Sequence, residues 1–171
     1  MQKLKTTLLL LLALLLLSLQ YLPSYDFFLN KSNQALHFQE VLAEKEKLLQ
    51  SKLRDVQQNH SSGLLQRIDR ELSEDFEGNG FSYFISVKGE LEFWSEDATA
   101  VDAEMLVKPT NLLISENAIH EKISLHKGDT IYYGLILIQQ TYPYQNRFLN
   151  NQLQEDFTIS GIEGIQLEKI E

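Results

Sequence analysis

The feature that most constrains this chain is a leucine run near its N-terminus. Ten of the twelve residues from Leu8 to Leu19 are leucine, Lys3 and Lys5 precede the run, and no acidic residue occurs in the first 25 positions. As a helix, the apolar stretch over residues 6–22 would be roughly 26 Å long, slightly short of a hydrocarbon core of about 30 Å. A basic start before an uninterrupted apolar run is typical of a signal peptide or a membrane anchor.

The residues after the run favour an anchor that stays attached. Cleavage would need small residues in an A-x-A-like pattern, whereas residues 18–26 read SLQYLPSYD. We therefore predict a membrane anchor over residues 1–22, with a removed signal peptide as the alternative. Lys3 and Lys5 place the N-terminus in the cytoplasm, so the residues after Leu22 are expected in the periplasm, beyond a single span of the inner membrane.

Composition excludes several classes of function. The chain has no cysteine, which excludes a disulfide scaffold, a thiolate metal site, a cysteine nucleophile and a lipid-modified N-terminal cysteine. A net charge of −9 disfavours nucleic acid as a partner, because phosphate contacts need clustered Lys and Arg. No dinucleotide, phosphate-loop, serine hydrolase or zinc protease motif is present, so we expect no catalytic residue and no cofactor.

Residues 23–63 are predicted to form mainly one long helix. Residues 31–58 contain no Gly or Pro, and apolar residues recur at intervals near 3.5. Lys45 and Lys52 interrupt this apolar stripe. Two interpretations stay open: a coiled coil in a parallel homodimer, or a helix packed on its own domain.

Residues 64–171 are predicted to form an α+β domain with an antiparallel sheet. A second amphipathic helix ends near residues 78–80, and a hairpin of residues 81–87 and 90–95 follows. A loop with a short helix near Ala103 leads to two further strands, which are joined by a turn at residues 127–129. The second of these, residues 131–138, is apolar on both faces and predicts a central strand, in which Gly134 indicates a bulge or a close approach. A short helix over 145–153 and a last strand over 158–171 complete the prediction.

Histidines and aromatics are the candidate site residues. His120 and His126 lie six residues apart on one strand, roughly 20 Å, so they cannot share a metal, and we expect both at the surface. Four aromatic residues come from strands that we expect to be neighbours, and their polar tips suit a small-ligand pocket, although ordinary sheet packing explains them as well. These candidate ligand-binding residues are Tyr83, Trp94, Tyr132 and Tyr133.

Two segments carry a more specific resemblance. Trp94-Ser95 follows a short hairpin strand, and the run from Gly134 to Phe157 contains GLILI and YPYQN. With the anchor and the long helix, this resembles the N-terminal extracytoplasmic sensor region of membrane-bound histidine kinases of Bacteroidetes type. The order of elements also resembles PAS/Cache-like sensor modules. The resemblance implies a sensor fragment or stub, truncated at its C-terminus, because the kinase modules of that family are not in this sequence.

The sequence thus supports two hypotheses. The first is the non-catalytic, extracytoplasmic sensor part of a two-component signal-transduction histidine kinase, anchored by Leu8–Leu19 and responding to a small-molecule or protein stimulus. The alternative is a single-pass envelope scaffold protein that assembles through its coiled-coil helix.

Overall fold

The computed structural model describes residues 33–60, 63, 65–147 and 150–158. The chain divides into two compact units, residues 1–40 and 41–171. No helix within the described ranges is long and apolar enough to cross a membrane. The predicted anchor over residues 1–22 and all but the first residue of the predicted last strand lie outside those ranges.

A helix runs through residues 33–60, as the absence of Gly and Pro predicts, and we call it the long helix. Its first eight residues belong to the first unit. The second unit continues with α2 (Leu65–Asn79). Gly80, with φ 69°, accepts the left-handed conformation that ends α2, and β1 begins at the next residue.

The predicted hairpin forms with a two-residue turn. β1 (Phe81–Val87) and β2 (Glu90–Trp94) pair around Lys88 and Gly89, whose φ angles of 52° and 87° are those of a type I′ turn. A bulge lets Ile85 face Phe93 while Ser86 faces Leu91. Leu91 therefore points away from the face that Ile85 and Phe93 share.

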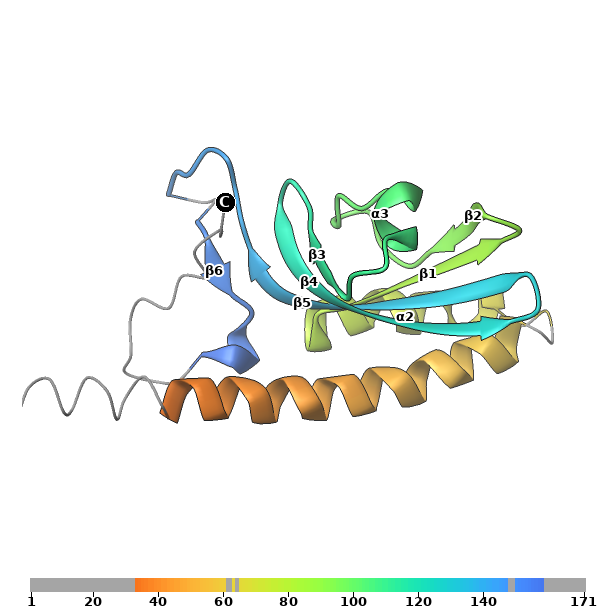
Figure 1. Cartoon of the computed structure of the whole chain (residues 1–171), viewed down its shortest axis with the longest axis horizontal. Coiled ribbons are helices and arrows are strands. Elements are labelled where there is room, and N and C mark those ends of the chain that lie inside the picture. Colours follow the sequence, from red (N-terminus) through yellow and green to blue (C-terminus); the bar gives the residue numbers. More distant parts are fainter. Residues whose placement is uncertain (1–32, 61–62, 64, 148–149, 159–171) are drawn as a thin grey trace, which may run out of the picture. The chain divides into compact units, whose positions relative to one another are not determined.

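The remaining elements complete an open antiparallel sheet. α3 (Ala103–Val107) precedes β3 (Leu112–Ile114), β4 (Ala118–Lys127) and β5 (Thr130–Gln140), and the strands lie in the order β2-β1-β5-β4-β3. The short helix predicted over 145–153 is wrong for the described residues of that range. Instead, β6 (Gln152–Leu153) pairs with the end of β5 and leads into the 3-10 helix η1 (Glu155–Phe157). The α+β fold class is confirmed (Figure 1).

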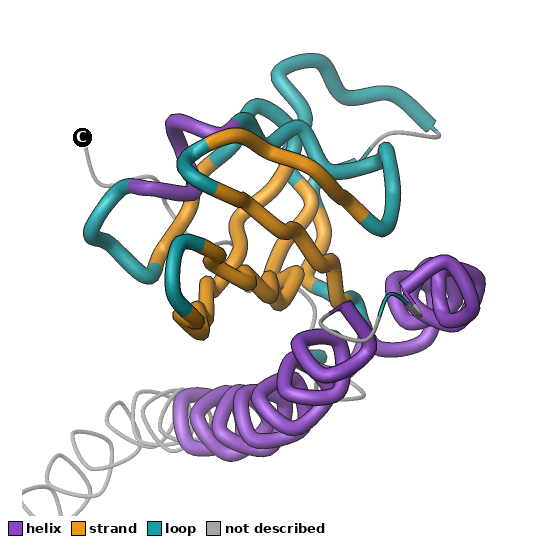
Figure 2. Tube along the Cα trace, turned by 90° about the vertical axis from the view of Figure 1, so that its right-hand side faces the viewer, coloured by secondary structure: helices purple, strands orange, loops and turns teal. Residues whose placement is uncertain are grey.

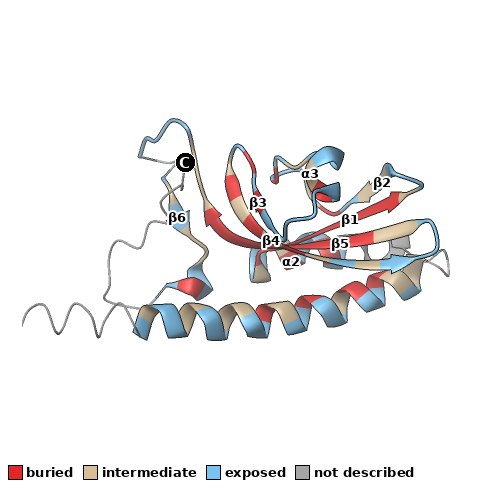
Figure 3. Cartoon of the chain, in the orientation of Figure 1, coloured by how far each residue is buried: buried red, intermediate tan, exposed pale blue. Residues whose placement is uncertain are grey.

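The two faces of the sheet are covered differently (Figure 2). Residues 41–60 of the long helix and α2 pack on one face, which we call the helix face. Gly134 of the central strand β5 permits this packing, because a Cβ there would lie 2.9 Å from Leu49 Cδ1. The expected close approach at Gly134 is thus confirmed, and Leu49, Leu53 and Val56 are buried. β5 itself is buried over most of its length, as predicted for a central strand (Figure 3).

The lysines that interrupt the apolar stripe of the long helix bind groups on the helix face. Lys45 Nζ donates to the Asn79 carbonyl at 2.7 Å, forms an ion pair with Asp156 and lies 5.4 Å from the centre of the Phe81 ring. Lys52 Nζ contacts both carboxylate oxygens of Asp75 at 2.8 Å. Each lysine therefore joins the helix to an element that lies far along the chain.

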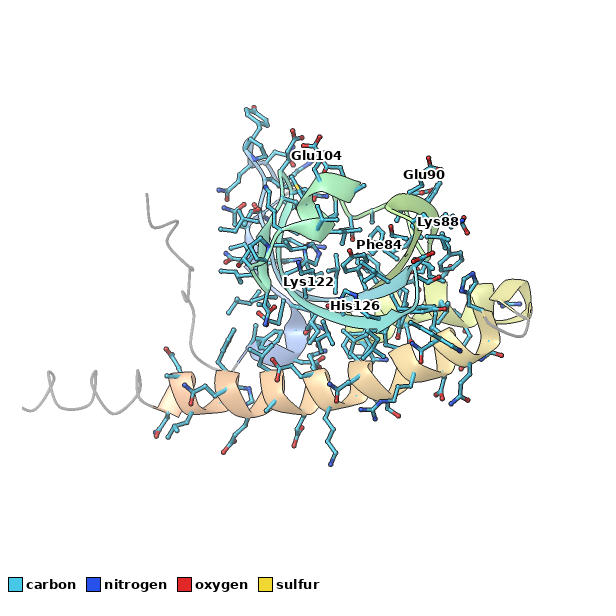
Figure 4. The ribbon with its side chains drawn as sticks, turned by 45° about the vertical axis from the view of Figure 1, so that its right-hand side comes forward. Phe84, Lys88, Glu90, Glu104, Lys122 and His126 are labelled. Carbon is cyan, nitrogen blue, oxygen red and sulfur yellow. The ribbon has the colours of Figure 1, made fainter. Side chains whose placement is uncertain are left out.

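The opposite face, which we call the α3 face, carries a smaller apolar cluster under α3. Its buried members are Phe84, Leu106, Leu113, Tyr133 and Leu135. Lys122 lies on the sheet beneath α3, whereas Glu104 lies on α3 itself (Figure 4). Lys122 Nζ donates to the Leu106 and Lys108 carbonyls, at 2.8 and 2.5 Å, and so binds the carbonyls that end α3. Burial lowers the pKa of Lys122.

On β4 the burial of polar and apolar side chains is the reverse of what the sequence predicts. His120 and Lys122 are buried on the α3 face, whereas Ile119 and Ile123 are only half-buried. The expectation that His120 is a surface residue is therefore wrong, while His126 is exposed as expected. The reason is tertiary: the loop over residues 95–100 covers His120, and α3 covers Lys122.

Candidate functional site

A small pocket lies on the α3 face where β4 and β5 meet. Its volume is about 60 Å³, and we call it the inner pocket. Phe76 of α2, Ala98, Ala118 and Leu137 form its apolar wall. Its polar groups come from loops and strand ends, namely Thr99, Asn117, His120, Gln140 and Tyr142.

His120 is the distinctive residue of the inner pocket. It is fully buried opposite Leu137, and neither Nδ1 nor Nε2 has a hydrogen-bond partner within the described ranges. Burial lowers the pKa of His120 to about 4, so the ring is neutral at neutral pH and has one N–H donor and one acceptor nitrogen. An unsatisfied buried polar group costs about 1–3 kcal/mol, and a bound molecule would remove that cost.

The loop over residues 95–100 forms the roof of this pocket and is firmly held. Glu96 Oε2 accepts hydrogen bonds from the Ala98 and Thr99 amides. Asn117 spans the loop, because its Nδ2 donates to the Ala98 carbonyl at 2.7 Å and its Oδ1 accepts from the Ala100 amide at 3.2 Å. The inner pocket is therefore built by specific contacts between segments that are distant in sequence.

A larger groove adjoins the inner pocket. Its volume is about 560 Å³, and Phe76, Leu137 and Gln140 line both spaces. We call it the outer groove. Its other lining residues come from the end of α2 and from the segment containing β6 and η1, and they are Glu77, Gln152, Leu153, Gln154, Glu155 and Thr158.

The last turn of α2 connects this site with the long helix. Phe76 lines the inner pocket, while the preceding Asp75 binds Lys52 of the helix and also accepts a hydrogen bond from the Tyr83 hydroxyl at 2.8 Å. Four residues after Asp75, the Asn79 carbonyl accepts the hydrogen bond from Lys45. One helical turn thus contacts the pocket with one residue and the long helix with two others.

The four aromatic residues predicted as a binding set are distributed over both faces. Tyr83 and Tyr132 are buried on the helix face, and the Tyr132 hydroxyl lies 2.9 Å from His60 Nδ1 at the end of the long helix. Burial and the Asp75 hydrogen bond raise the pKa of Tyr83 far above its usual value. Tyr133 belongs to the cluster under α3. The structure therefore does not bring the four together in one pocket.

Trp94 lies beside the roof loop and does not line the inner pocket. Its indole N–H donates to Asp97 Oδ1 at 2.8 Å, and the residue is 49% exposed. Because it is the only tryptophan in the sequence, it is a natural fluorescent reporter of the loop that covers the pocket.

Sequence reasoning missed His120 as a site residue. Its neighbours Lys122, Ser124 and His126 on one face of the strand suggested a solvated surface. The loop before β3 carried no signal that it would fold over that face. Asn117, in the turn between β3 and β4, holds that loop through its hydrogen bonds with Ala98 and Ala100, a contact that local sequence does not reveal.

Comparison of the chain with protein-family models, with curated proteins and with solved structures finds no match.

Proposed function

We propose that this chain is the extracytoplasmic sensor part of a two-component histidine kinase, a PAS/Cache-like module that binds a small molecule in the inner pocket. In this proposal Leu8–Leu19 anchor the chain in the cytoplasmic membrane, and the residues after Leu22 lie in the periplasm. The long helix carries the signal towards the membrane, and a parallel homodimer would form through residues other than the buried Leu49, Leu53 and Val56.

One observation carries the proposal: the last turn of α2 contacts both the inner pocket and the long helix. A molecule against Phe76 would displace that turn, and the Asp75–Lys52 and Asn79–Lys45 contacts would transmit the displacement. A ligand shifts a conformational equilibrium only through different contacts in its two states, and these contacts supply such a difference. The architecture gives further support, because a long helix followed by an antiparallel sheet is the order of elements that the PAS-like resemblance implies.

The packing of the long helix favours this proposal over the envelope scaffold. Leu49, Leu53 and Val56 are buried within their own unit, so the apolar stripe that a coiled coil would use is already occupied there. Leu48 of the same helix is exposed and therefore lies outside the buried stripe. In a sensor the same packing is useful, because it makes the position of the helix depend on the sheet.

A substitution that fills the inner pocket tests the coupling between the pocket and the long helix without any ligand. Ala118→Val adds two methyl groups to a buried wall residue, and Ser124→Val adds comparable bulk to an exposed position on the same face of β4. We expect Ala118→Val, and not Ser124→Val, to change the amide hydrogen exchange of residues 41–60. Equal exchange in both variants at equal global stability would contradict the proposal.

Localisation needs a separate measurement. Alkaline phosphatase fused to the C-terminus is active only where it is exported. The proposal predicts an active fusion that stays in the membrane fraction, and an inactive fusion would contradict a periplasmic sensor.

A further inference from the structure

The charge of the inner pocket restricts the ligand that it can take. His120 is the one residue with an ionisable nitrogen in its lining, which contains no lysine, arginine, aspartate or glutamate. Because the buried ring is neutral, an anionic group would find no cation there and a cationic group no carboxylate. Of the remaining polar side chains, Asn117 already holds the roof loop and Thr99 is paired with Ser82. This leaves the Tyr142 phenol and the Gln140 amide N–H for an uncharged partner.

Size restricts the ligand further. At about 60 Å³, the inner pocket is too small for a whole drug-sized molecule but has room for one small polar group. The outer groove, at about 560 Å³, lies within the range of small-molecule sites. A ligand with a small uncharged end and a larger body therefore fits the two adjoining spaces.

The outer groove supplies both hydrogen-bond donors and acceptors. Gln140, Gln152 and Gln154 have amide side chains, Glu77 and Glu155 have carboxylates, and no lysine or arginine lines the groove. Phe76 and Leu153 add apolar surface. Hydroxyl groups match this set well, since each one can donate to a carboxylate and accept from an amide.

We propose that the inner pocket and the outer groove together bind an uncharged polyhydroxylated molecule, one hydroxyl of which hydrogen-bonds the His120 ring while its body lies against Phe76 and the glutamines. This inference rests on the proposed sensor function and names its class of ligand. His120 is the specificity-determining residue of the site. Gln140, which lines both spaces, contacts the ligand where its end enters the inner pocket.

The experiment uses the full-length chain in detergent with three polyol probes, glycerol, D-ribose and D-glucose, each up to about 10 mM, which reaches dissociation constants in the millimolar range. Three readouts are followed: the ¹⁵N resonances of the His120 ring, the fluorescence of Trp94 and the Tm. We expect at least one polyol to shift the His120 resonances, to change the fluorescence and to raise the Tm by a few degrees.

Charged probes test the class of ligand. Putrescine and acetate, at the same concentrations, are expected to leave the His120 resonances unchanged. A response to either probe in place of the polyols would overturn the assignment, and so would the absence of any response to all three polyols.

Two substitutions locate the site. His120→Phe is expected to weaken polyol binding more than about tenfold, because the hydroxyl loses its hydrogen-bond partner. His126→Phe on the same strand is the matched control and should bind as the unaltered chain does. If circular dichroism shows that His120→Phe does not fold, Gln140→Ala carries the same test. Binding that persists at full strength in the folded variant would overturn the proposal.

The outcome is distinct from that of the pocket-filling test. If polyols do not bind but Ala118→Val still alters hydrogen exchange in the long helix, the ligand class is wrong and the sensor function stands. If polyols bind but the helix does not respond, the site is correct and the coupling is wrong.

Discussion

Two buried polar side chains, one on each face of the sheet, differ in their partners. On the helix face, Asp75 is buried and receives hydrogen bonds from Lys52, Tyr83 and Asn79. On the α3 face, His120 is buried and neither ring nitrogen has a partner among the residues described. A buried polar group with its partners fixes one arrangement of the elements, whereas one without partners lowers stability and is available to a ligand. Asp75 thus holds the elements of the helix face in position, whereas His120 on the α3 face is the group that the proposed ligand would bind.

The largest expected effect breaks the packing of the helix face. Leu49→Ala should lower the free energy of unfolding by about 2–5 kcal/mol, because it leaves a cavity against Gly134. Gly134→Ala should cost about 1–3 kcal/mol through overpacking, since its Cβ would meet Leu49. The double variant should lose less than the sum of the two, and denaturant unfolding measures all three. Strict additivity would contradict the close contact of these residues.

A second prediction concerns the α3 face and its dependence on pH. His120 has a pKa of about 4 in the folded protein and the ordinary 6.5 when unfolded, so the unfolded state binds the proton first as the pH falls. Stability is therefore unaffected by this group above pH 6.5, falls between pH 6.5 and 4, and levels off below 4, a loss of about 3 kcal/mol.

Comparison with His120→Phe isolates this contribution. Asp156 has a pKa that is lowered by its hydrogen bond with Lys45, so its contribution to the stability of the protein also falls at acid pH. That loss is equal in both proteins. The difference in unfolding free energy between the two proteins should therefore depend on pH only through the titration of His120. An identical pH dependence of both proteins would contradict the burial of an unpartnered imidazole.

A third prediction sharpens the contrast between paired and solvated carboxylates. Asp75→Asn should cost about 1.5–3 kcal/mol, because hydrogen bonds to a charged acceptor are lost from Lys52 and Tyr83. Glu74→Gln, which removes the charge of the adjacent exposed residue paired with Arg70, should stay within about 0.5 kcal/mol. Thermal or denaturant unfolding measures both losses of stability. Similar losses in the two variants would contradict the stabilising role of the Asp75 contacts with Lys52 and Tyr83.

The smallest expected effect is local. Lys122→Met removes the hydrogen bonds to the Leu106 and Lys108 carbonyls but also the desolvation of the ammonium, so the net loss should be about 1 kcal/mol. Amide exchange should rise in α3 and remain unchanged in the long helix. Equal increases in both would mean that Lys122 supports the whole fold and not α3 alone.

The predictable part of this fold is the part with local periodicity or turn chemistry. The long helix, the turn at Lys88-Gly89 and the central strand around Gly134 follow from their own residues. The pocket does not, because His120 is buried by a loop whose path depends on Asn117 and the Ala98 carbonyl. β6 was missed for a similar reason, since a two-residue strand has no period and exists only through pairing with β5.

The most direct test of the central claim is a double-mutant comparison of hydrogen exchange in residues 41–60. Ala118→Val fills the inner pocket, and Asp75→Asn weakens the junction between α2 and the long helix. The account predicts that Ala118→Val changes exchange in the helix, and that most of this change disappears when Asp75→Asn is also present. A change of the same size with and without Asp75→Asn would contradict transmission through the last turn of α2.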